Sequence, residues 1–432
     1  MSKEVNKVKP DFGVKGWIVL IYMFIVFFLN TTCDSGWQNV LNYFQESFGW
    51  SATTLMTVVS VGKAITIVTA YFFGRLLVKK SARMLGIICG AVVVVCAACM
   101  HMVTSMGLFI AIEIIITIAQ TTWAWSVNPV LVANFFPKKK SMAMGIITIG
   151  IPLGAGTTTI FYGAWAAAFG YKYCFMYPGL VAFIALVLLV VFVRDTPEKM
   201  GYRPDNDPNL TSEDVRKLAL ADMEETKNSP WTTKRIFSKP RLIILGLVIG
   251  LAPFFGGGVM GTLVTGMLEW GTPMNLIMVV MLTGAFGACI FSYIFGIIDA
   301  KLGARVGYVI AFICAIVSGL LLFKGMYLPA LFAGVILVGA ISGGSSNFMT
   351  SLLIDWFGPS KMKGVYAVIL PLHQLTSSLG NAFFAQLDAR LGGYQYAALA
   401  SCAVMAVALI IFIIVSKDGK QFVETCEAEW SK

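Results

Sequence analysis

The sequence predicts an all-α membrane protein in which twelve transmembrane helices form two pseudo-symmetric six-helix bundles. Three observations lead to this fold class. Hydrophobic residues make up 58% of the chain and charged residues 12%, about half the roughly 25% of charged residues in soluble domains, and the mean hydropathy is +0.80. Apolar runs of about twenty residues recur from end to end, each long enough to cross a hydrocarbon core of ~30 Å. The two halves of the chain also repeat at one fixed offset.

The predicted spans follow one another as two groups of six. The first group comprises residues 16–44, 51–77, 84–103, 107–133, 142–168 and 173–193. The second group comprises residues 241–268, 274–298, 306–323, 327–354, 364–387 and 393–415. The longer runs carry polar residues within the crossing, and such residues usually face a protein interior or a water-filled cavity.

A long hydrophilic break separates the two groups. We expect residues 1–193 to form an N-terminal six-helix bundle and residues 241–432 a C-terminal six-helix bundle with a cytoplasmic tail. Residues 194–240 would form a cytoplasmic connector. Within it, Thr211-Ser-Glu-Asp214 has the spacing of a capping box, and the residues that follow predict a short amphipathic helix.

The net charge of +10 is distributed by topology rather than gathered into a binding patch. Lysines and arginines concentrate at the start of the chain and in alternate loops: Lys3, Lys7, Lys9, Lys15, Lys79, Lys80, Arg83, Lys138, Lys139, Lys140, Lys301, Arg305, Lys361 and Lys363. The intervening loops hold Lys172, Lys324 and Arg390. The positive-inside rule therefore predicts a multi-pass protein of the cell membrane with both termini in the cytoplasm. We expect a monomer whose partners are the lipid bilayer and a small transported molecule, and no nucleic acid.

Several other function classes fit the sequence poorly. Nine cysteines and two histidines show neither paired nor metal-ligand spacing, so we expect no metal site, no cofactor and no catalytic residue. No Walker-type phosphate loop is present, which excludes an ATP-driven pump. A membrane sensor would need a folded cytoplasmic domain, for which the connector and tail are too short.

The repeat is visible in two separate loops. An offset of 222 residues places Gly74 on Gly296, Lys79 on Lys301, Ala82 on Ala304 and Arg83 on Arg305, after the second span of each half. The same offset places Phe135 on Phe357, Pro137 on Pro359 and Lys139 on Lys361, after the fourth span. This pattern predicts parallel halves related by an axis along the membrane normal, with a binding site at their interface near the midplane.

These loops resemble those of a known family. The segment from Gly296 to Arg305, with Asp299 between them, resembles the loop signature of the major facilitator superfamily. The first copy keeps Gly74 and Arg83 but has Leu77 at the acidic position. Residues 134–145, Asn-Phe-Phe-Pro-Lys-Lys-Lys-Ser-Met-Ala-Met-Gly, are similar to the loop after the fourth helix in the oxalate:formate antiporter and monocarboxylate transporter branch.

The resemblance implies the major facilitator fold and transport by alternating access. It also implies that the loop signature clasps the cytoplasmic helix ends, so that Arg75, Arg83, Asp299 and Arg305 are gating residues. The branch carries an arginine in the eighth helix, whereas residues 276–298 contain none here. That departure weakens any expectation of a small dianion as substrate.

Charged residues are rare inside the spans, and the depth of each can be read from the turns. Asp34 lies 14 residues before the turn near Phe48 and Lys63 lies 15 residues after it, so both lie about 21–23 Å from that turn. Opposite charges at one depth predict an ion pair, which lowers the cost of burying both. His373 lies roughly 18 Å into the eleventh span. The resemblance implies that it would face Lys63 across the interface between the halves.

These residues define the predicted site. The substrate-binding set is Lys63, His373, Gln120, Trp123, Asn347 and Gln374, and the coupling set is Asp34, His373 and Glu113. Each has a purely structural alternative: Lys63 as a packing ion pair with Asp34, His373 as a neutral imidazole bonded to a neighbouring helix, and Glu113 as a rim pair with His101. Either Trp123 or Trp125 could face the cavity.

The predicted function is secondary active transport of an organic anion, most simply a monocarboxylate, coupled to protons through His373 or Asp34. A carboxylate exchanger with a counter-anion, a carrier of a bulky amphipathic acid such as a bile acid or an aromatic acid, a drug efflux antiporter and a non-transporting sensor stay open as alternatives.

Overall fold

The described part of the protein is almost entirely helical. The structure, a computed structural model, describes residues 11–217, 229–325 and 327–430. The first half contains α1 (Gly13–Phe48), α2 (Ala52–Lys79), α3 (Ala82–Cys99), η1 (Met100–Met102), α4 (Met106–Thr122), η2 (Trp123–Val127), α5 (Asn128–Phe135), α6 (Lys140–Thr148), α7 (Gly150–Phe169), η3 (Tyr171–Tyr173) and α8 (Met176–Val191).

The second half repeats this organisation after a connector that contains η4 (Pro197–Met200) and η5 (Pro204–Asn206). It contains α10 (Thr233–Phe237), α11 (Pro240–Ile249), α12 (Leu251–Glu269), α13 (Met274–Leu302), α14 (Ala304–Leu322), α15 (Leu328–Ser378), α16 (Gly380–Leu391), α17 (Tyr394–Val415) and α18 (Gly419–Trp430). α15 turns at Gly358, whose φ of 74° is outside the helical region, so it carries two consecutive predicted spans.

The predicted all-α membrane fold is confirmed. Ten helices in the described ranges are long and apolar enough to cross a membrane, or eleven when the bent pair Leu328–Gly343 and Phe348–Gly358 counts as one span. The remaining predicted span, 364–387, is built from the end of α15 and from α16, which are separated at Leu379. Because the helix is interrupted there, this predicted span is not a single long apolar helix.

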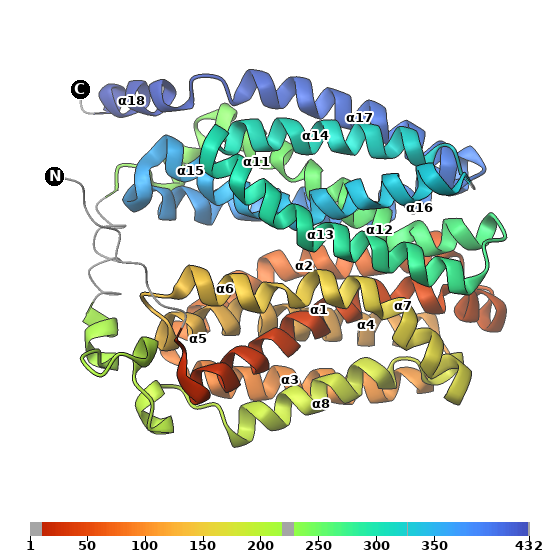
Figure 1. The fold of residues 1–432 in the computed structure, drawn as a ribbon, viewed down its shortest axis with the longest axis horizontal. Coiled ribbons are helices and arrows are strands. Elements are labelled where there is room, and N and C mark those ends of the chain that lie inside the picture. Colours follow the sequence, from red (N-terminus) through yellow and green to blue (C-terminus); the bar gives the residue numbers. More distant parts are fainter. Residues whose placement is uncertain (1–10, 218–228, 326, 431–432) are drawn as a thin grey trace.

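Each half packs around its own apolar core. In Figure 1, α1 to α8 form one layer of the molecule and α11 to α17 form the other. The first core extends from Phe12 to Tyr202 and the second from Trp231 to Cys426. A smaller aromatic cluster around Trp37 and Phe109 lies where α1 ends. Both main cores extend into the connector predicted at residues 194–240, the first through Tyr202 and the second through Trp231 and Ile236.

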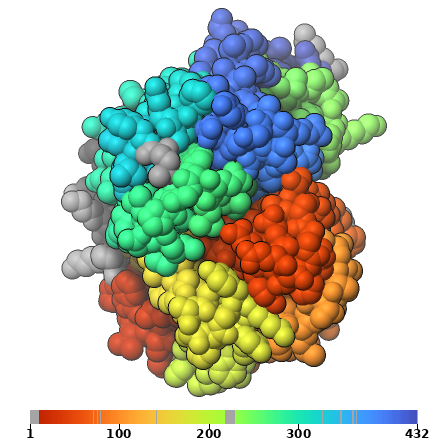
Figure 2. Space-filling view, turned by 90° about the vertical axis from the view of Figure 1, so that its right-hand side faces the viewer, coloured from red at the N-terminus to blue at the C-terminus, as the bar shows by residue number. Residues whose placement is uncertain are grey.

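The two ends of the bundle differ. The start of α1, the connector and α18 lie together at one end, which we call the connector end (Figure 1). The turn between α1 and α2 lies at the opposite end. There, a groove of about 750 Å³ lies between the halves and is lined by Asn42, Gln45, Glu269 and Asp388 among others. Figure 2 shows this opposite end, where the α1–α2 turn meets the second half.

Equivalent lysines are clamped in both halves at the connector end. The backbone N–H groups of Lys138 and Lys139 donate to the Asp205 carboxylate over 2.8 and 3.0 Å. In the second half, Lys361 donates to the Glu427 carboxylate of α18 over 2.6 and 2.8 Å. The offset that relates Lys139 to Lys361 also relates Asp205 to Glu427. The repeat thus extends into the segments that follow each bundle.

The electrostatics of the second clamp favour an ionised Glu427. Partial burial acts to raise the pKa of this carboxyl, but hydrogen bonds from Lys361 and Trp231 outweigh it, so the pKa lies below its usual range. The Trp231 indole N–H donates over 2.8 Å. α18 is therefore attached by a charged contact to Lys361 of α15, just after the turn at Gly358, and by the indole hydrogen bond to Trp231, two residues before α10.

Glycines let the helices of the site approach closely. A Cβ at Gly154 of α7 would lie 2.6 Å from the Phe28 carbonyl oxygen of α1, and a Cβ at Gly156 would lie 2.0 Å from the Ala285 Cβ of α13. α7 therefore packs against the first half with one glycine and against the second half with the other, as small residues allow in membrane helices.

Candidate functional site

Three polar side chains one helical turn apart organise the centre of the protein. Asn30, Asp34 and Gln38 follow one another at intervals of four along α1, so they share one face and are separated by about 6 Å along the axis. Each anchors a different partner. Together they divide the site into three layers from the connector end to the opposite end.

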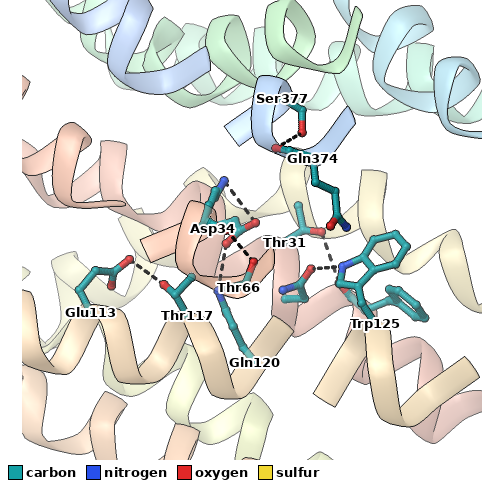
Figure 3. A network of polar contacts seen from close by, with 12 residues as sticks. Thr31, Asp34, Thr66, Glu113, Thr117, Gln120, Trp125, Gln374 and Ser377 are labelled. Atoms are coloured by element: carbon teal, nitrogen blue, oxygen red, sulfur yellow. Dashed lines mark hydrogen bonds and ion pairs between the residues drawn. The ribbon is translucent and has the colours of Figure 1, made fainter. Parts of the chain in front are cut away.

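The middle layer contains the predicted ion pair. The Lys63 ammonium of α2 lies 3.3 Å from Asp34 Oδ2, and the two side chains are 27% and 29% exposed. Gln120 of α4 donates from Nε2 to Asp34 Oδ1 over 2.9 Å. Figure 3 shows Asp34 and Gln120 pointing toward each other between the helices. Because both ions keep part of their surface accessible in mid-span, they border a space rather than a closed core.

The Lys63 ammonium can accommodate an anion in place of Asp34. An ammonium group has three N–H donors and no acceptor, and among the described residues its recorded partner is Asp34. The backbone around it is held separately, because Thr66 donates from its hydroxyl to the Lys63 carbonyl over 2.6 Å. The helix therefore need not move when the charged end changes partner.

A π-helical turn forms the layer nearer the connector end. Pro129 has no backbone N–H and its ring conflicts with the carbonyl four residues earlier, which explains why α4 continues into α5 through the π-turn η2. Trp125 in this turn is 45% exposed. Its indole N–H donates to Asn30 Oδ1 over 3.1 Å.

The structure corrects the prediction for Trp123. This side chain is 0% exposed, donates to the Tyr22 hydroxyl over 2.7 Å, and packs where Gly86 and Gly90 leave room for its ring. It belongs to the core of the first half and does not line the space beside Lys63. Trp125, two residues on and therefore on the other side of the helix, is the indole that does.

The second half contributes Gln374 from α15. Figure 3 shows the Gln374 side chain extending from this helix toward Trp125 and α1, with Ser377 on the same face. The Ser377 hydroxyl donates to the Gln374 carbonyl over 3.0 Å. Two further predicted residues are outside the set of described side chains: Asn347 of the binding set and Arg75 of the gating set.

The structure does not bring His373 to the ion pair as predicted. Both of its ring nitrogens are buried without a hydrogen-bond partner, and its backbone packs against Gly250 at the junction of α11 and α12. Its neighbour Gln374 faces the first half instead. Within the described ranges, the imidazole thus has no hydrogen-bond acceptor in this conformation.

Glu113 lies behind the ion pair rather than at the rim. It is 1% exposed and accepts a hydrogen bond of 3.0 Å from Thr117. The alternative of a rim pair with His101 is wrong, because the His101 Nδ1 lies 2.5 Å from the Ala98 carbonyl oxygen and its ring contacts Tyr173.

The layer nearer the opposite end joins the two halves. Gln38, one turn beyond Asp34, accepts from the Val264 backbone N–H of α12 over 3.4 Å. Ser60, one turn from Lys63 on the same side, accepts from the Ala382 N–H of α16 over 3.2 Å. These two bonds close the site toward the opposite end. Sequence reasoning missed both residues, although the interval of four between Asp34 and Gln38 is a signal that could have found one.

The predicted gating residues make their contacts within their own halves. Arg83 donates to the Val190 carbonyl over 2.7 Å, and Arg305 donates to Ser416 Oγ over 3.0 Å and to the Ile413 carbonyl over 3.2 Å. Asp299 accepts from Ser351 over 2.5 Å. Each arginine thus binds the end of the sixth helix of its half. The described contacts show no latch across the interface in this conformation.

Comparison with known proteins decides the family. A sequence model described as the Major Facilitator Superfamily matches residues 23–288, more than half of the chain. The chain belongs to the major facilitator superfamily. The protein is accordingly a multi-pass membrane transporter of this superfamily. No curated protein matches its sequence significantly.

Solved structures of major facilitator transporters share its fold at low sequence identity. A bacterial homologue of the human lysosomal transporter Spinster, in an inward-facing and unoccupied conformation, has a TM-score of 0.70 and 12% identity and covers 96% of this chain and 98% of its own. The nucleoside transporter NupG has a TM-score of 0.70 and 11% identity, covering 92% and 99%. The human organic anion transporter MFSD10 has a TM-score of 0.63 and 16% identity, covering 93% and 100%. The different substrates in these descriptions show that the fold does not specify the cargo.

Proposed function

We propose that this transporter carries an organic anion, most simply a monocarboxylate, together with a proton, and that Lys63 is the anion-binding group. The observation that carries this proposal is the ion pair of Lys63 with Asp34, which lies in mid-span, a quarter exposed, opposite Gln374 of the second half. Charges in such positions are costly and serve transport pathways. The resemblance to the monocarboxylate and oxalate:formate branch supports the choice of a carboxylate.

Charge balance explains how one ion pair couples the anion to a proton. In the empty carrier Asp34 neutralises Lys63. When a carboxylate binds the ammonium, a proton on Asp34 keeps the sum of charges in the site at zero. The loaded and empty forms then carry the same charge through the membrane, so both can change conformation without leaving an unpaired buried ion.

Asp34 suits this role better than His373 in the present conformation. Asp34 contacts Lys63 directly and is partly exposed, whereas both ring nitrogens of His373 are buried without partners. Glu113, bonded to Thr117 behind the pair, is a second place where a proton could be held. His373 would act only if another conformation exposes its ring.

The hydrogen bonds at Gln38 and Ser60 indicate from which side of the membrane the site is reached in the present conformation. We infer from the basic loops that the connector end faces the cytoplasm, as the positive-inside rule predicts. The two halves are joined on the far side of the ion pair, and we therefore propose that the substrate reaches the site from the cytoplasmic side in the present conformation. Alternating access then requires these two bonds to break and the clasps around Asp299 and Arg305 to meet across the interface.

Uptake into proteoliposomes with an imposed pH gradient tests the proposal. Symport predicts accumulation of a carboxylate without internal substrate, loss of uptake in Lys63→Ala, and loss of gradient-driven accumulation in Asp34→Asn with exchange retained. His373→Gln serves as the matched variant and should keep accumulation. Transport that requires preloaded counter-anion and ignores the gradient would show exchange instead. Inhibition by organic cations alone would exclude the anion.

A further inference from the structure

Trp125 is unusual among the tryptophans near the site because it is both exposed and held in place. Its side chain is 45% exposed in mid-span, while its N–H is fixed by Asn30, which is itself only 5% exposed. The ring meets Phe27 edge-on, with ring centres 5.0 Å apart and planes at 86°. The polar edge is therefore satisfied, and the apolar face remains available.

The position of this face relative to Lys63 is set by α1. Trp125 is anchored to Asn30 and Lys63 is paired with Asp34, and these anchors are one turn, about 6 Å, apart on the same helix face. Gln120 of α4 and Trp125 of the π-turn η2 contact the same two layers. A carboxylate at Lys63 would therefore direct the rest of its molecule toward the indole.

The second half bounds the same space. Gln374 extends toward Trp125 in Figure 3, so its amide lies near the indole. The Gln374 amide gives this space a polar group, and the Trp125 ring gives it an apolar surface. That combination suits a flat body with at most a few polar substituents.

We propose that Trp125 forms the apolar wall of the binding site and that the substrate is a monocarboxylate with a planar apolar body of about one ring, an arylcarboxylate. This rests on the proposed function, because it assumes that Lys63 binds the carboxylate. Formate, acetate and oxalate leave the indole uncovered, and the organic part of an arylcarboxylate fills the distance of about 6 Å between the two layers. Offset stacking or an edge-on contact with the indole then favours a ring over an alkyl chain of similar length.

Competition binding on the purified full-length protein tests the proposal. The probes are acetate, butyrate, benzoate and phenylacetate, measured on the wild type, Trp125→Phe, Trp125→Ala and Lys63→Ala. We expect the wild type to prefer benzoate over acetate, Trp125→Ala to weaken benzoate about tenfold with acetate nearly unchanged, and Trp125→Phe to retain most of the preference. Trp17→Phe, at another half-exposed tryptophan about five turns from Asp34, should change nothing.

The outcomes separate this inference from the function on which it rests. Equal loss of acetate and benzoate in Trp125→Ala, or a wild type that binds acetate as well as benzoate, would overturn the arylcarboxylate assignment while Lys63-dependent binding stands. Carboxylate binding that survives Lys63→Ala, or no carboxylate binding by the wild type, would overturn both. A thermal melt of each variant confirms folding, and Trp125→Phe keeps the test valid if Trp125→Ala does not fold.

Discussion

Asn30, Asp34 and Gln38 show how single side chains set the levels of this site. Asn30 orients the indole of Trp125, Asp34 holds Lys63 and Gln120, and Gln38 binds the backbone of the second half. All three lie on one face of α1, so a change at one level alters the others only through the helix. Single substitutions at these three residues therefore test each level of the site separately.

Removing the amide of Gln120 should weaken the positioning of Asp34 without removing a charge. Gln120→Leu deletes the donor that contacts Asp34 Oδ1 at 2.9 Å, a hydrogen bond to a charged group worth about 1.5–3 kcal/mol. We expect the carboxylate affinity to change by less than in Lys63→Ala, while the ratio of proton-driven uptake to exchange falls. Parallel uptake and exchange assays measure this ratio. An unchanged ratio would show that Gln120 does not orient Asp34 for coupling.

Two of the predicted residues were misplaced for local reasons that composition and spacing do not reveal. Trp123 and Trp125 are both deep in the fourth span, and the π-turn caused by Pro129 decides that Trp125 faces the space beside Asn30. His373 and Gln374 are adjacent, and the contact of α15 with Gly250 decides which of them faces the first half. By contrast, the pairing of Lys63 with Asp34 followed from their distances to one turn.

At the scale of whole elements, the clamps at the connector end bind each bundle to the segment that follows it. The connector binds the loop before α6 through Asp205, and α18 binds α15 through Glu427 and Lys361. The repeat places these contacts at equivalent positions, and no sequence motif for them was recognised because the two partner segments share little beyond the acidic residue.

The Glu427 contact should contribute a pH-dependent part of the stability. Its pKa is depressed in the folded protein, so the stabilisation is present above the ordinary glutamate pKa of about 4.3 and is lost as the pH falls through the lower folded value. We expect Glu427→Gln to lower the melting temperature at pH 7, and this difference to shrink as the pH approaches the folded pKa. Glu424→Gln, an exposed position on the same helix, is the control. A difference that does not depend on pH would contradict the ionic contact.

The π-turn η2 should matter for specificity although Pro129 does not contact Lys63 or Asp34 in any recorded interaction. Pro129→Ala restores a backbone N–H and permits a regular helix, which would turn Trp125 away from Asn30. We expect the preference for benzoate over acetate to fall, with Lys63-dependent binding of acetate retained. Competition binding with the same probes measures this. A preserved preference would show that the π-turn is set by its surroundings and not by the proline.

At the scale of the whole molecule, the two halves meet one turn beyond the ion pair, at Gln38 and Ser60. The twofold repeat and the two cores could be predicted from the sequence, because loop residues recur at one offset. The side on which the halves are joined could not be predicted, because these bonds use the backbone N–H groups of Val264 and Ala382, which every residue except proline supplies. The populated conformation depends on such hydrogen bonds to the backbone, which a sequence pattern does not reveal.

Weakening the closed layer should shift the conformation of the whole protein. Ser60→Ala and Gln38→Ala each remove a hydrogen bond worth about 1 kcal/mol, so we expect each to favour opening toward the opposite end by about fivefold. Spin labels at Gln45 and Ala389, which line the groove there, report the opening as longer distances in a background with the native cysteines replaced. Unchanged distance distributions in the double variant would exclude these bonds as the gate.

Proton uptake on binding tests the central claim, that Asp34 releases Lys63 to the anion by taking a proton. An arylcarboxylate is added to purified protein in weakly buffered solution, and the protons absorbed per bound anion are counted. The account predicts about one proton per anion in the wild type, none in Asp34→Asn with binding retained, and no binding in Lys63→Ala. Binding to the wild type without proton uptake, or proton uptake that persists in Asp34→Asn, would contradict it.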